Sequence, residues 1–149
     1  MNNFKWLLMV PLATLLSLSF AAGKATGNLS VKVDGDKAFV TARNASESPL
    51  RVWERTTLAG RGGGNLLFLA VNDLGQVAQP CAFVSSPVGS GRPMELSYGN
   101  EKEVWRGNLR TLSKLYCLEP GSYIGSFVYV SPGKEFLFSP SFKFDVASN

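Results

Sequence analysis

The sequence predicts an all-β fold: an antiparallel β-sandwich of about seven to nine strands, preceded by an export signal. First, from Leu29 onward apolar residues alternate with polar residues in short runs, the period of strands that bury one face. Second, Gly, Pro, Asn and Asp separate these runs at near-regular intervals. Third, helical spacing is confined to 109–118, and no change of composition marks a second domain. Residues 26–149 are therefore expected to form one sandwich domain.

The first half of that domain contains four predicted strands. The runs are 29–33, 38–42, 50–55 and 66–71. The first two are joined by Asp34-Gly35-Asp36, a short turn that predicts a hairpin. In the third run we expect Leu50 and Val52 to face inward. The fourth run is continuously apolar and flanked by glycine, which favours a strand buried on both faces.

The second half is predicted to contain further strands and one short helical turn. The candidate strands are 81–84, 94–98, 101–106, 122–130 and 142–146, and the helical spacing lies within 109–118. Pro80, between Val77 and the 81–84 run, suits an edge strand or a bulge. We expect Tyr123, Phe127 and Phe144 in the core, because they lie in the two clearest alternating runs.

The N-terminus reads as a secretory signal peptide over residues 1–25. Lys5 supplies a positive start, 7–20 form a short apolar run, and small residues follow at 21–23. The run is shorter than the ~20 apolar residues that a membrane span needs. We expect cleavage between Ala21 and Ala25, a periplasmic or extracellular destination, and no stable membrane insertion afterwards. An uncleaved N-terminal anchor is the alternative.

The charge of the chain gives little support to a nucleic-acid partner. The 15 basic and 11 acidic residues give a formal net charge of +4. Lys5 and Lys24 lie in the predicted signal, which leaves 13 basic residues against 11 acidic ones, a net charge of +2. The remaining basic residues are scattered singly, whereas a nucleic-acid footprint gathers them on one face.

Two features of the composition restrict the chemistry. The sequence has no histidine, which excludes Ser-His-Asp triads, Cys-His pairs and His-bearing zinc sites. Its two cysteines, Cys81 and Cys117, form an even pair in an exported chain and predict a disulfide. The alternative is two free thiols, one of them a nucleophile, which would lack an activating His. We expect no metal and no cofactor.

Turn motifs along the chain carry a resemblance to a known family of folds. They are Asn44-Ala45-Ser46 with Pro49-Leu50, Asp73-Leu74-Gly75, and the segment 116–123, in which Pro120-Gly121 precedes Tyr123. The region 29–146 resembles immunoglobulin-like and fibronectin-III-like domains, and is similar to the bacterial proteinase-inhibitor family that uses this sandwich. Antibody-type domains place a Cys two residues after the corner tyrosine. Here Cys117 precedes that tyrosine, so the disulfide is a different one.

The segment 58–65 is the first candidate binding site. Four glycines surround Arg61, including Gly62 and Gly63, and no Gly-Lys-Ser/Thr ending marks a phosphate loop. One interpretation is a connection between strands. The other is an adaptable binding loop that presents Arg61, since recognition often concentrates on loops held by a rigid scaffold.

Aromatic and acidic residues give two further candidates. Trp53, Tyr98 and Trp105 could form a platform for a sugar ring, or could pack in the core; for Trp53 the core is the expectation. Glu95, Glu101 and Glu103 lie close together in the sequence, but a glycosidase needs two carboxylates at a set separation in space. We expect them to be solvated.

The sequence therefore predicts an exported binding protein rather than an enzyme. The expected partner is another protein, such as a secreted peptidase or other secreted enzyme that the domain inhibits or neutralises, and the expected binding surface is formed by loops. A module that binds carbohydrate or the cell envelope through exposed Tyr98 and Trp105 is the alternative.

Overall fold

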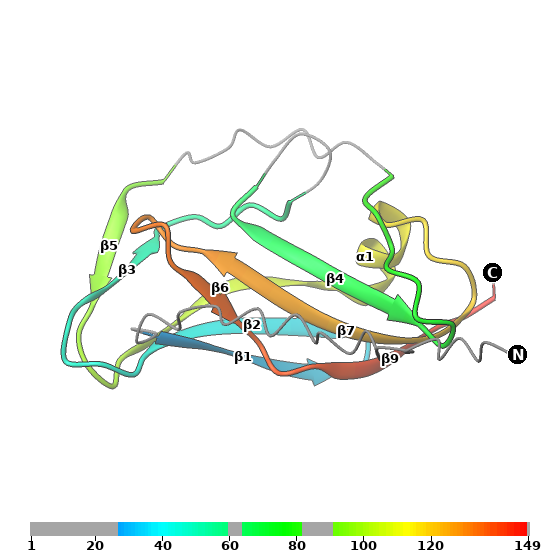
Figure 1. Cartoon of the computed structure of the whole chain (residues 1–149), viewed down its shortest axis with the longest axis horizontal. Helices are drawn as coiled ribbons and strands as arrows, with labels where there is room; N and C mark the ends of the chain where they lie inside the picture. The colour runs from blue at the N-terminus through cyan, green and yellow to red at the C-terminus, as the bar shows by residue number, and fades with distance from the viewer. Residues whose placement is uncertain (1–26, 60–63, 82–90, 149) are drawn as a thin grey trace, which may run out of the picture.

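Two antiparallel sheets lie face to face in the computed structural model, which describes residues 27–59, 64–81 and 91–148 (Figure 1). The elements are β1 (Gly27–Asp34), β2 (Lys37–Asn44), β3 (Leu50–Trp53), β4 (Leu66–Asn72), β5 (Pro93–Leu96), β6 (Glu101–Asn108), α1 (Leu109–Leu115), β7 (Gly121–Val130), β8 (Phe136–Phe138) and β9 (Phe142–Val146). The predicted all-β sandwich is confirmed. The predicted signal peptide, 1–25, lies outside the described residues, as does most of the predicted strand 81–84. Within the described residues, no helix is long and apolar enough to cross a membrane.

The first sheet has the strand order β1-β2-β6. The predicted turn at Gly35 joins β1 to β2 as an antiparallel hairpin, with Leu29 opposite Ala42 and Val31 opposite Val40. Ala38, Val40 and Ala42 are completely buried, so the alternating pattern of this strand identifies its core face.

The second sheet is formed by β4, β7, β8 and β9. β8 and β9 pair with the same strand, β7, and the chain between them is interrupted at Ser139 and Pro140. Ser139 bridges the interruption: its N–H donates to Phe127 O, and its Oγ accepts from Phe127 N–H. β8, which has only three residues, was not predicted from the sequence.

The prediction that 66–71 is buried on both faces is wrong. Leu66, Phe68 and Ala70 are buried, whereas Leu69, on the opposite face, is 38% exposed. The strand belongs to one of the two packed sheets, and only the face that points toward the other sheet contacts the core. Its apolar outer positions need a different explanation.

A small sheet of β3 and β5 closes one end of the sandwich. Leu50 and Val52 are fully buried there, as predicted. The buried side chain of Asn44 holds this end together: its Oδ1 accepts from Ser46 N–H, and its Nδ2 donates to the carbonyls of Ser48 and Leu96. Asn44 thereby ties the backbone of its own loop to β5.

The core between the sheets is rich in aromatic rings. Phe68 packs against Phe127 with ring centroids 5.0 Å apart and against the edge of Tyr116 at 5.3 Å. Gly125 on β7 makes room for this cluster, because a Cβ there would lie 2.9–3.1 Å from the rings of Phe142, Phe68 and Phe144. Phe127 and Phe144 are buried as predicted, and Tyr123 is partly buried against the core.

A bulge in β6 lets two neighbouring side chains reach the core. Val40 faces Trp105 across the strand pair but Thr41 faces Glu103, so Val104 has no direct partner on β2. Val104 is buried, and the Trp105 ring packs on Phe127 at 5.4 Å. Two residues of opposite parity can share one face at such a bulge.

The strand order is that of an immunoglobulin-type sandwich. β1-β2-β6 and β4-β7-β9 correspond in sequence and pairing to strands A-B-E and C-F-G of that architecture. At the start of β7 the Tyr123 hydroxyl donates to Glu119 O at 3.1 Å, the bond of a tyrosine corner.

The predicted helical turn is α1, and the predicted disulfide lies beside its end. Asn108 caps the helix by accepting a hydrogen bond from Arg110 N–H on its Oδ1. Cys81 and Cys117 are bonded, with their Cα atoms 5.9 Å apart, an ordinary span for a disulfide. The bond fixes the segment after β4 to the end of the helix.

Candidate binding surface

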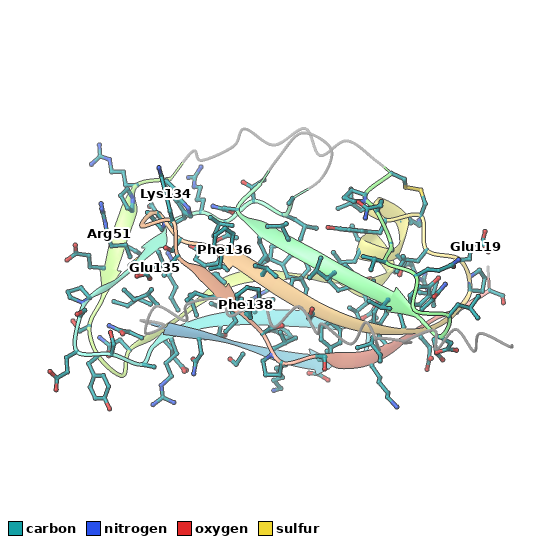
Figure 2. All side chains as sticks on the ribbon, in the orientation of Figure 1. Arg51, Glu119, Lys134, Glu135, Phe136 and Phe138 are labelled. Carbon is teal, nitrogen blue, oxygen red and sulfur yellow. A yellow bond between two sulfur atoms is a disulfide. The ribbon has the colours of Figure 1, made fainter. Side chains whose placement is uncertain are left out.

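The outward side of the second sheet is lined by apolar side chains. Register places eight of them on this side, and we call the set the apolar outer face: Leu67, Leu69 and Val71 of β4, Ile124, Val128 and Val130 of β7, and Phe136 and Phe138 of β8. Two are aromatic and strongly exposed, Phe136 at 58% and Phe138 at 65%. Figure 2 shows both rings on β8.

The apolar outer face is continuous across the strands. Leu67 faces Val128, and Val128 faces Phe138, which gives one apolar row across three strands. A second row runs from Val71 to Ile124, which is 49% exposed. Side chains directly opposite each other on one face of a sheet are in contact distance, which joins the residues within each row. The row between them pairs Leu69 with Ser126, so Leu69 links the two apolar rows along β4.

The outward side of the first sheet has the opposite character. Its residues are mostly charged or polar: Ser30, Lys32, Lys37, Phe39, Thr41, Arg43, Glu101, Glu103 and Arg106. Phe39 is covered by the Arg106 guanidinium, which lies 5.5 Å from its ring centre. Arg106 is also paired with Glu103 at 2.8 Å, and this pair raises the pKa of Arg106. An antiparallel sheet that meets water on one side carries such residues there.

The contrast between the two outward faces marks the second sheet as the candidate site. A sheet face that is in contact with water usually carries polar side chains, and the outward side of the first sheet does so. An exposed contiguous apolar patch on a soluble domain is typical of a surface that meets a partner. Lysines lie at its borders: Lys143 faces outward opposite Ile124, and Lys134 lies in the turn before β8 (Figure 2).

The predicted glycine-rich binding loop lies mostly outside the described residues. Arg61, Gly62 and Gly63 lie outside the described residues, so their role stays a prediction. The base of the loop is closed, because Asn65 Oδ1 accepts from Thr57 N–H at 2.7 Å and Asn65 N–H donates to Thr57 O. Gly64 has a φ of +154°, and a Cβ there would lie 2.5 Å from Ala59 Cα, so this position requires glycine.

The structure does not bring Tyr98 and Trp105 together as an aromatic platform. Tyr98 is 68% exposed in the turn between β5 and β6, whereas Trp105 points inward and packs on Phe127. Its ring lies across Gly107, where an added Cβ would collide with it. Trp53 packs against the core, as expected, and its Nε1 donates to Val130 O. Of the two alternatives for Trp105, packing in the core is the one that the structure has.

The three glutamates are distributed over two sheets and are exposed. Glu95 lies on β5, in a different sheet from Glu101 and Glu103. Glu103 is held by the Arg106 guanidinium in two hydrogen bonds. Among the described residues, no group of three or more His, Cys, Asp or Glu side chains lies close enough to hold a metal ion.

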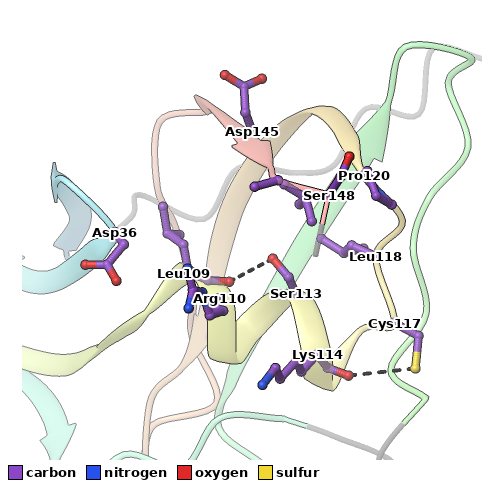
Figure 3. Close-up of a pocket in the computed structure, with 12 residues that line it drawn as sticks. Asp36, Leu109, Arg110, Ser113, Lys114, Cys117, Leu118, Pro120, Asp145 and Ser148 are labelled. Carbon is purple, nitrogen blue, oxygen red and sulfur yellow. Dashed lines mark hydrogen bonds between the residues drawn. The ribbon is translucent and has the colours of Figure 1, made fainter.

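A hollow of about 620 Å³ lies between α1 and the C-terminal end of the described chain (Figure 3). Arg110 and Lys114 line it from the helix. Several of its polar groups are bonded within the protein: Ser113 Oγ donates to Leu109 O, and Asp145 accepts from Ser122. Ser113 and the bonded oxygen of Asp145 are therefore already engaged within the protein.

Sequence reasoning missed the main element of the candidate surface, the Phe-Leu-Phe of β8. The signal was present, because Phe136 and Phe138 flank Leu137 with the period of a strand, and Leu137 is buried. Two aromatic side chains on the face opposite a buried leucine are unusual in an edge strand that is exposed to water.

No protein-family model and no curated protein sequence matches this chain.

Proposed function

We propose that this protein is an exported binding protein that holds another protein against its apolar outer face. The observation that carries the proposal is the exposure of Phe136 and Phe138 beside an apolar sheet, while the other sheet is polar outside. Aromatic side chains are enriched at protein interfaces and supply much of their binding energy. The proposed role is to block or neutralise the partner, such as a secreted peptidase or other secreted enzyme, without catalysis.

The two exposed rings account for part of the area that a protein interface needs. With about 150–250 Å² for each aromatic side chain, the exposed fractions of the two phenylalanines give roughly 250 Å² of ring surface. Typical stable interfaces bury about 800 Å² on each partner. The rings would therefore form the centre of an interface, and the lysines at the border would belong to its polar rim.

Carbohydrate binding has weaker support. A sugar platform needs exposed coplanar rings, and Trp105 is turned into the core. Export is supported by the sequence of residues 1–25 and is compatible with the disulfide between Cys81 and Cys117.

The test is a comparison of two matched variants in a capture experiment. Phe138→Ser removes an exposed ring from the apolar outer face, and Thr41→Lys changes a partly exposed position on the polar face of the first sheet. The proposal expects wild type and Thr41→Lys to capture the same exported protein, and expects Phe138→Ser to bind it at least tenfold more weakly. Equal affinity of all three proteins, at equal melting temperature, would overturn it.

A further inference from the structure

Within the part of the chain that the structure describes, the outer edge of β8 has backbone groups that no strand uses. In the β7–β8 ladder, Ser131 N–H donates to Glu135 O, and Ser139 N–H donates to Phe127 O. Hydrogen-bonded pairs alternate with non-bonded pairs along an antiparallel ladder. The alternation makes Tyr129–Leu137 a bonded pair, and it directs the peptide N–H and C=O of Phe136 and Phe138 away from β7.

The outer edge of β4, on the opposite side of the same sheet, is sealed. Phe68 N–H donates to the Tyr116 hydroxyl, Ala59 N–H donates to Leu66 O, and Ala78 N–H donates to Ala70 O. β1 lies beside β8 but pairs with β2, and no backbone hydrogen bond joins β1 to β8 in the described chain. The edge of β8 therefore differs from that of β4 in offering both unpaired backbone groups and exposed rings.

We propose that the partner binds as an extended segment that adds a strand to the edge of β8. This inference rests on the proposed function and specifies its partner chemistry. Backbone bonds to Phe136 and Phe138 would supply affinity, and alternate apolar side chains of the segment would lie beside the two rings, as in other strand additions. The bound segment would continue the second sheet.

The charges beside this edge specify the flanks of the segment. Lys134 and Glu135 are both exposed before β8, and Glu135 already has an interaction within the protein. Lys143 is exposed on the outward side of β9. The outward-facing carboxylate of Asp145 already accepts a hydrogen bond from Ser122. The complementary segment is therefore apolar at alternate positions in its middle and acidic at its ends.

A second copy of this chain is a poorer occupant. Pairing two β8 edges would join strands of only three residues, and the two rings expose roughly 250 Å². A stable dimer needs about 800 Å² from each partner. A short extended segment can use the backbone groups of Phe136 and Phe138 without the large domain–domain contact that a stable dimer needs.

The test uses a short capped peptide with glutamates at both ends and valines alternating with threonines between them. Its matched control is the same peptide with N-methylated valines, which cannot donate backbone hydrogen bonds. In NMR hydrogen exchange of the whole mature protein, the parent peptide should slow the amides of Phe136 and Phe138 at least tenfold and leave Leu137 unchanged. The N-methylated peptide should bind at least tenfold more weakly.

Three outcomes would overturn the inference. If the Phe138 ring signals shift while its amide exchange does not change, the face binds without strand addition, and the proposed function stands. If neither peptide binds, strand addition is wrong, and the capture experiment with Phe138→Ser still judges the proposed function separately. If the protein alone forms a dimer that protects the same amides, the occupant is a second copy.

Discussion

Phe138 lies directly opposite Val128 across the β7–β8 pair, and the two differ sharply in exposure. The ring is 65% exposed, whereas the valine is only 8% exposed although it points away from the sandwich core. Leu67 on one side and Phe138 on the other shield the valine. The apolar outer face thus has a small buried centre at Val128, and the Phe138 ring beside it is exposed to solvent.

This relationship predicts that two phenylalanines in the same sheet contribute very differently to stability. Phe127→Ala should lower the free energy of unfolding by about 3–5 kcal/mol, because Phe127 is fully buried. Phe138→Ser should lower it by less than about 1 kcal/mol, as for other exposed positions. Urea denaturation of both variants measures the difference. A loss of several kcal/mol in Phe138→Ser would mean that its ring serves the fold.

A second prediction concerns the space that Gly125 leaves for the aromatic cluster. An alanine Cβ would lie within 3.1 Å of three rings, so they must shift. Gly125→Ala should destabilise the protein by about 1–3 kcal/mol, the usual cost of overpacking. Ser126→Ala, one residue along the strand and on the opposite face, is the control and should change stability by less than about 0.5 kcal/mol. Equal effects would contradict the packing.

The third prediction concerns the buried hydroxyl of Tyr129. It accepts a hydrogen bond from Trp53 N–H at 2.7 Å, and burial raises its pKa above the ordinary value. Tyr129→Phe leaves that N–H without its partner and should cost about 1–3 kcal/mol at neutral pH. Tyr98→Phe is the exposed control and should cost almost nothing.

The raised pKa also fixes a pH dependence. The folded state keeps the Tyr129 hydroxyl protonated, so the stability linked to this group is fully present below the unfolded pKa of about 10. That contribution is lost as the pH rises through the higher folded pKa. Burial raises the pKa of Tyr116 as well. Urea midpoints should fall above about pH 10, and less steeply in Tyr129→Phe; identical slopes would contradict this assignment.

The core-facing positions of the strands could be predicted from the sequence, whereas the apolar outer face could not. Period-two runs identify core residues such as Val40 and Phe127, because burial on one face constrains every second position. The same rule fails for β4, where the outer residues are apolar too, so periodicity suggested burial on both faces. Trp105 was ambiguous because a bulge, which no local pattern reveals, turns it inward with Val104. The apolar outer face depends on the register in which strands distant in the sequence pair. The sequence of a single strand does not determine that register.

The most direct measurement of the central claim is site-specific photocrosslinking in cells that produce the protein. Benzoylphenylalanine replaces Phe138 on the apolar outer face or Phe39 on the outward side of the first sheet, and each substitution keeps an aromatic ring. The account predicts that the probe at position 138 crosslinks a specific second protein and that the probe at position 39 does not. The same products from both positions, or none from position 138 in a folded protein, would contradict it.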